Sequence, residues 1–142
     1  MRRFLKDRSG GLTIVTYGLI VVLLLFFALI TEMGAVIENH EYAESVLQRS
    51  CNIAVEENIM DEFRQDRILK LDVAEAKKSF RKYAYKDMPA RFSLTIDRID
   101  CTEMPPSMTA SGTLTFSTVF DYYDFDDITY TYTVVATNYD IE

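Results

Sequence analysis

The side chains in this 142-residue sequence that are best suited to chemistry are two cysteines, a single histidine and a cluster of aspartates. Cys51 and Cys101 would form a disulfide bond in an oxidising compartment, or would remain as two buried free thiols. His40 is the one histidine that is available to activate a cysteine, and it lies roughly 16 Å from Cys51 along a predicted helix. The sequence therefore predicts no cysteine catalysis, and it favours a packing role for His40.

The aspartates lie close together late in the chain, at Asp121, Asp124, Asp126 and Asp127. Several carboxylates can bind Ca²⁺, but this segment lacks the glycine turn and the distal glutamate of an EF-hand loop. We expect a solvated turn, with a calcium site as the alternative. The sequence contains no other metal-ligand spacing, no Ser-His-Asp pattern and no glycine-rich phosphate loop. It therefore favours a protein without a cofactor and without enzymatic activity.

An uncharged segment, LTIVTYGLIVVLLLFFALI, occupies residues 12–30. As a helix it would reach roughly 28 Å, which matches the apolar core of a bilayer. Residues 1–11 carry four basic side chains and one acidic side chain, which leaves 11 basic and 21 acidic residues for the rest. The distribution of basic residues predicts a single membrane-spanning helix with a cytoplasmic N-terminus and an extracytoplasmic domain at residues 31–142. The acidity of that domain argues against nucleic acid as a partner.

The helical pattern continues beyond the apolar segment, so we expect one helix from about residue 12 to about residue 60. Small and apolar residues recur there at spacings of three and four: Val36, His40, Ala43, Leu47, Ser50, Cys51 and Ala54. A second helix is predicted from Asp72 as its N-cap, with Glu75 three residues later, to a point before Pro89.

After Arg91 the apolar period changes from 3.6 to 2, which predicts strands. Three alternating runs begin near Phe92, Leu114 and Ile128, with Phe120 included in the second, and Cys101 is expected just after the first strand. Short connections favour an antiparallel meander. The expected fold is α+β, with the outer part of the long helix and the shorter helix packed on a three-stranded antiparallel sheet.

The N-terminal junction is similar to a known family. The segment FLKDRSGG at residues 4–11, followed by the apolar run with Tyr17, resembles the leader and helix start of Flp pilins and of TadE-like pseudopilins of tight-adherence pilus systems. The EMG sequence at residues 32–34 is similar to the Glu-Phe-Gly of TadE-like proteins, and the length of the chain fits that branch better. The family resemblance implies a pilin-like fold and cleavage by a prepilin peptidase between Gly11 and Leu12.

The same resemblance implies a role in assembly, as a minor pilin or pseudopilin of a type IV pilus-like fibre. Its partners would be the membrane, the prepilin peptidase, other pilin subunits and the pilus assembly platform. The family carries Glu just before the Tyr, whereas this chain has Thr16. Because a carboxylate there would neutralise the N-terminal ammonium of a neighbouring subunit, Thr16 suggests a minor subunit at a tip or in an initiating complex. The alternative is an uncleaved, single-pass, membrane-anchored binding or accessory protein.

Overall fold

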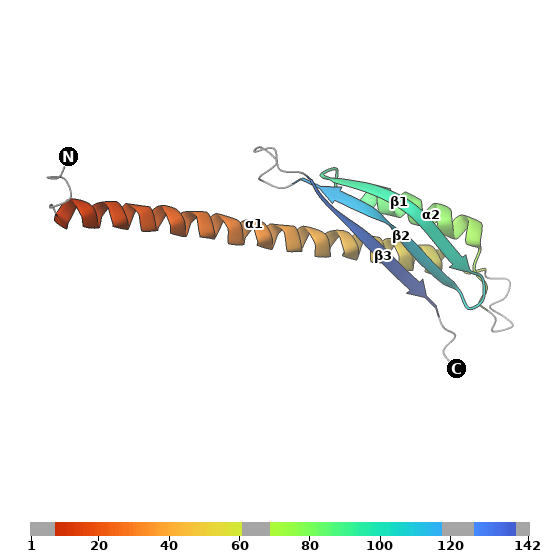
Figure 1. Ribbon diagram of the computed structural model, residues 1–142. Coiled ribbons are helices and arrows are strands. Elements are labelled where there is room, and N and C mark those ends of the chain that lie inside the picture. Colours follow the sequence, from red (N-terminus) through yellow and green to blue (C-terminus); the bar gives the residue numbers. More distant parts are fainter. Residues whose placement is uncertain (1–7, 61–68, 118–126, 139–142) are drawn as a thin grey trace. The chain divides into compact units, whose positions relative to one another are not determined.

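The computed structural model describes residues 8–60, 69–117 and 127–138. In these residues the chain forms a long helix, a shorter helix and a three-stranded antiparallel sheet, which confirms the α+β class (Figure 1). The elements in chain order are α1 (Arg8–Glu57), α2 (Val73–Asp87), β1 (Phe92–Thr102), β2 (Ser107–Phe116) and β3 (Ile128–Thr137). The chain divides into two units, Met1–Glu38 and Asn39–Glu142, and α1 contributes to both.

In the first unit, residues 12–30 of α1 carry no charge on any side of the helix. No side chain in its most apolar stretch is buried in the protein. A helix in a globular domain has one apolar face, whereas a helix that is apolar all round needs an apolar environment on every side. By length and composition this helix can cross a membrane.

In the second unit, α1 buries a single stripe of side chains. Ala43, Leu47, Cys51 and Ala54 are fully buried, at the spacings of three and four that the sequence predicted. Glu38, Glu41 and Glu44 are exposed on the same helix. The change from an apolar helix to an amphipathic helix therefore occurs within one continuous element.

The shorter helix has the predicted cap. The Asp72 carboxylate accepts hydrogen bonds from the backbone N–H groups of Ala74 and Glu75, at 3.0 and 3.1 Å. These bonds satisfy donors that the first turn of a helix leaves unpaired. The helix ends at Asp87, before Pro89, as expected from the restriction that proline places on the preceding residue. It buries one face, formed by Ala76, Phe80 and Ala84.

The sheet has the order β1-β2-β3, and both of its connections are antiparallel. Two boundaries differ from the prediction, because β1 continues to Thr102 and β2 begins at Ser107. Cys101 therefore lies inside β1 and not after it. The reason is a β-bulge between Ile96 and Arg98, which shifts the inward-facing positions of β1 by one residue and interrupts the alternation in the sequence. Phe120 lies outside the described residues.

Next to the bulge, a tyrosine from β3 crosses the central strand. Tyr132 is almost fully buried, and its hydroxyl donates a hydrogen bond to the carbonyl oxygen of Thr95 in β1, at 3.4 Å. The residue beneath it in β2 is Gly112, which is paired with Tyr132 on one side and with Ile96 on the other. A Cβ atom at position 112 would overlap the Thr95 carbonyl, so this crossing requires glycine.

The helices cover one face of the sheet. Figure 1 shows the last part of α1 and all of α2 on the same side of the three strands. Aromatic rings pack where α1 meets the strands: His40 against Tyr130, with ring centroids 4.2 Å apart, and Tyr42 against Phe92, with centroids 6.4 Å apart. The inward residues of β2 are buried and alternate with serine and threonine on the other face. The core of the second unit therefore lies between the helices and the sheet.

Candidate functional site

The predicted cleavage site lies in the first turns of α1. Gly10 and Gly11 are both helical and exposed, and a Cβ at either position would meet no other atom. Each glycine costs a helix about 1 kcal/mol relative to alanine. The bond between Gly11 and Leu12 therefore lies where two adjacent glycines weaken the helix, and nothing among the described residues covers it.

Thr16, which occupies the predicted assembly position, carries no charge. The Thr16 hydroxyl donates a hydrogen bond to the carbonyl oxygen of Leu12, at 2.9 Å, one turn earlier in the same helix. A threonine hydroxyl that is bonded in this way can enter an apolar environment without an unpaired donor. Leu12, Thr16, Tyr17 and Ile20 line a shallow groove on one side of the helix, and Tyr17 is 68% exposed.

Both cysteines lie in the second unit, where Cys51 is buried, Cys101 is partly exposed and their sulfurs are not bonded to each other. Cys51 is fully buried, and its Sγ lies 3.7 Å from the carbonyl oxygen of Met108, to which the thiol donates. Burial, and then the neighbouring Cys101, raise the pKa of Cys51 to about 12. Burial also raises the pKa of Cys101, with Lys77 acting in the opposite direction. Both groups are therefore mainly protonated at neutral pH, and neither has the lowered pKa of a catalytic cysteine.

His40 makes contacts that suit a packing residue. Its ring lies against Tyr130, and its Nδ1 is 3.9 Å from a carboxylate oxygen of Glu44 on the next turn of α1. The hydroxyl of Tyr130 is buried and has no hydrogen-bond partner among the described residues. Burial, and then the negative charge of Glu44, raise the pKa of Tyr130 to about 12.

The aspartate cluster lies mostly outside the described residues, which include Asp127 but not Asp121, Asp124 or Asp126. Asp127 is exposed. Within the part of the chain that the structure describes, no group of three or more His, Cys, Asp or Glu side chains is placed to hold a metal ion. The calcium alternative therefore stays a prediction.

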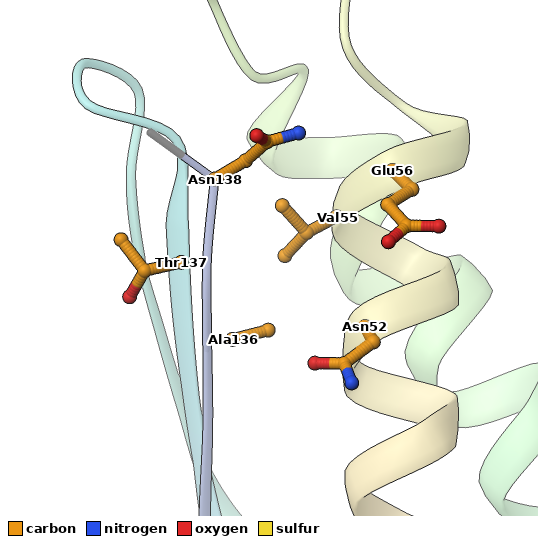
Figure 2. Close-up of a pocket in the computed structure, with 6 residues that line it drawn as sticks. All are labelled: Asn52, Val55, Glu56, Ala136, Thr137 and Asn138. Carbon is orange, nitrogen blue, oxygen red and sulfur yellow. The ribbon is translucent and has the colours of Figure 1, made fainter. Parts of the chain in front are cut away.

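Two surface hollows lie against the described residues of the second unit. The first has a volume of about 100 Å³ and lies between α1 and the end of β3. Figure 2 shows Asn52 and Val55 of α1 directed toward Ala136, while Thr137 points away from the helix. Glu56 is the one ionisable side chain that lines it. This hollow has room for a few water molecules and offers no pair of groups for catalysis.

The second hollow is an open groove of about 500 Å³ at the start of α2, lined by Lys70, Lys77 and Glu103 among others. A helix N-terminus beside two lysines suggests an anion site. However, the Asp72 carboxylate already accepts from the first free N–H groups of α2, and Lys70 lies 3.2 Å from Glu103. The charges of the groove are therefore largely compensated within the protein.

Comparison of the chain with models of known protein families, with characterised proteins and with solved structures finds no match.

Sequence reasoning did not identify Met108 and Tyr130, the residues that complete the surroundings of Cys51 and His40. The signal was present in the alternation of the strands, because both residues occupy inward positions of β2 and β3. What the sequence lacked was the register between α1 and the sheet, which determines the inward residue that each helical side chain contacts.

Proposed function

We propose that this protein is a minor pilin or pseudopilin of a type IV pilus-like assembly, inserted in the membrane through α1 and processed by a prepilin peptidase between Gly11 and Leu12. In this proposal its role is structural. The apolar part of α1 anchors the subunit in the bilayer before assembly and packs against the helices of other subunits in the fibre. The domain at residues 31–142 faces the extracytoplasmic side.

The observation that carries the proposal is the composition of α1 along its length. Residues 12–30 are uncharged on every side and exposed, whereas Ala43, Leu47 and Cys51 form one buried stripe against a sheet. A plain membrane anchor needs the first property but not a continuous helix into the domain. A subunit that moves from the bilayer into a helical bundle needs both, because its backbone must stay hydrogen-bonded in each environment.

The leader supports the processing step. Gly10 and Gly11 weaken the first turns of α1, so local unwinding to present an extended segment to a protease costs little. The apolar segment that follows begins directly at Leu12. Cleavage there would leave a positively charged N-terminus at the start of an uncharged helical segment.

Thr16 supports a minor position in the fibre. A buried ammonium is expensive unless a carboxylate lies close to it. The Thr16 hydroxyl donates a hydrogen bond to the carbonyl oxygen of Leu12, and the side chain provides no negative charge. Such a subunit is best suited to a place where no neighbour presents its N-terminus, such as the tip of a fibre or an initiating complex.

The decisive experiment measures the intact mass of the full-length protein from membranes with and without the prepilin peptidase of the same organism. We expect a peptidase-dependent loss of residues 1–11, which leaves Leu12 at the N-terminus. Gly11→Val should abolish cleavage, since a branched side chain would replace the small residue before the cut. Gly10→Ala is the matched control, because it lies one residue away and should be processed as the wild type is.

An unchanged mass, with the peptidase active on a control pilin, would refute the processed subunit and favour the uncleaved anchored protein. Thr16→Glu tests the assembly position separately. We expect it to spread the subunit along the fibre, as seen by immunogold labelling, whereas the wild type labels one end. Wild-type labelling along the whole length would contradict the minor role.

A further inference from the structure

The two cysteines reach the same point of the core from different elements. Cys51 lies on the buried stripe of α1, and its sulfur contacts the backbone oxygen of Met108, at 3.7 Å. Met108 is the first inward residue of β2. The sulfur of Cys51 is therefore directed from the helix onto the sheet at this residue.

Cys101 is the residue directly opposite Met108 in β1. Paired residues of an antiparallel sheet have their Cα atoms about 4.5–5.5 Å apart and their side chains on the same face. Ile99 and Cys101 are the less exposed positions at the end of β1, and they alternate with the exposed Asp100 and Thr102. Cys101 therefore shares the helix-covered face with Met108, next to the position that the Cys51 sulfur contacts.

Within the described residues no metal site includes a cysteine. Cys101 is partly exposed, whereas Cys51 is fully enclosed. A partly exposed thiol beside a buried thiol is the arrangement in which an oxidant reaches one sulfur and the second sulfur then completes the bond.

We propose that Cys51 and Cys101 form a disulfide bond that fastens α1 to β1 once the domain is outside the cytoplasm. The oxidant is the reactive disulfide of an extracytoplasmic thiol oxidase. The Cys101 sulfur attacks that disulfide and forms a mixed disulfide, and the Cys51 sulfur then displaces the enzyme. One S–S bond forms in this protein as one breaks in the oxidase, which leaves with two thiols that carry the two protons and the two electrons.

The bond has a mechanical consequence for the proposed function, on whose extracytoplasmic placement it rests. In the second unit α1 is held mainly by side-chain packing, with a hydrogen bond from Gln48 to the carbonyl oxygen of Val135, at 2.7 Å. A force that extracts α1 from the bilayer acts along the helix. The disulfide would transfer that force to the sheet through a covalent bond.

The test counts free thiols in the full-length protein. Membranes are denatured under non-reducing conditions, and the protein is treated with a maleimide of high mass that shifts its band on a gel. We expect no shift without reductant and two adducts after reduction. In Cys51→Ala and in Cys101→Ala the remaining cysteine should react without reductant, and a host without the thiol oxidase should yield two adducts. Two adducts from an oxidase-competent host would overturn the proposal.

A second variant shows why such a failure occurs. Thr133→Cys, in a Cys51→Ala and Cys101→Ala background, places a single thiol on an exposed position of β3. If a membrane-impermeant maleimide labels this thiol on intact cells, the domain lies outside the cytoplasm. Two free thiols in the wild type would then refute the proposed pairing of Cys51 with Cys101. If the thiol is not labelled, the extracytoplasmic placement on which the proposal rests is wrong. Thiol counts do not depend on cleavage at Gly11, so the disulfide and the processing step fail separately.

Stability provides the independent readout. In oxidised wild-type protein in detergent, addition of a reductant should lower the unfolding temperature of the domain by on the order of 10 °C. The double alanine variant should not respond to the reductant. An equal response of both proteins would contradict a bond between these two residues.

Discussion

Gly112→Ala should destabilise the second unit, Asn39–Glu142, strongly, although it adds only one methyl group. The new Cβ would overlap the backbone carbonyl of Thr95 and would lie 2.8 Å from the hydroxyl oxygen of Tyr132. The carbonyl belongs to the bulged part of β1 and the ring belongs to β3, so both neighbouring strands must move. A backbone atom cannot rotate away as the end of a flexible side chain can.

The expected loss follows from two contributions. Overpacking a filled core costs about 1–3 kcal/mol. Displacement of the Tyr132 hydroxyl from the Thr95 carbonyl costs about 1 kcal/mol more. Alanine also lowers the conformational entropy of the unfolded chain, and this effect offsets less than about 1 kcal/mol of the lost unfolding free energy. We therefore predict a net loss of about 2–3 kcal/mol, a large part of the roughly 5–15 kcal/mol that stabilises a small domain.

Urea unfolding of the full-length protein in non-ionic detergent measures this loss. The chain has nine tyrosines and no tryptophan, so near-ultraviolet circular dichroism follows the tyrosines. Tyr132→Phe separates the two contributions, since it removes the hydroxyl and leaves the space, and it should cost about 1 kcal/mol. Gly34→Ala is the matched control, because its Cβ meets open space and should cause no loss. A Gly112→Ala protein as stable as the wild type would refute the reasoning.

Three further predictions concern the core, the cap and the titration of the domain. Leu47→Ala truncates a fully buried side chain of α1 and should lower the free energy of unfolding by about 3 kcal/mol in the same urea assay. A loss under about 1 kcal/mol would contradict the packing of α1 on the sheet. Asp72→Ala removes the cap of α2 and should cost about 1 kcal/mol, whereas Asp72→Asn should retain most of the stability; equal losses would argue against capping. Tyr130 should ionise near pH 12 in an ultraviolet titration, and not near pH 10. Because folding favours its neutral form, its contribution to stability is complete below pH 10 and is lost as the pH rises from 10 through 12, and Tyr130→Phe should reduce that loss.

The helices were predictable from the sequence because their signals are local. The apolar spacing that ends near Ala54 and the Asp72 cap depend on residues within a few turns of one another. The strand boundaries were less predictable. In β1 the bulge between Ile96 and Arg98 shifts the inward positions by one residue, so the strict period of two ends there although the strand continues.

The requirement for glycine at position 112 was not predictable for a related reason. It depends on three strands being in register, with the Tyr132 ring above Gly112 and the Thr95 carbonyl turned toward it. No local pattern contains that information. Similarly, the sequence offered Cys51 and Cys101 as a pair, but only the register of β1 and β2 places Cys101 opposite Met108.

The side chains of α1 show how one helix can serve two environments. In a bilayer a polar group must find its partner within the protein, and the hydroxyls of Thr16 and Thr31 each donate to a carbonyl four residues earlier, at 2.9 Å. Beyond residue 38 the demands change, since a sheet covers one side of the helix and water the other. There the buried stripe consists largely of small residues, such as Ala43 and Ala54, which allow close approach to the strands. The continuous backbone of α1 meets both demands with the same hydrogen bonds, and only the side chains differ.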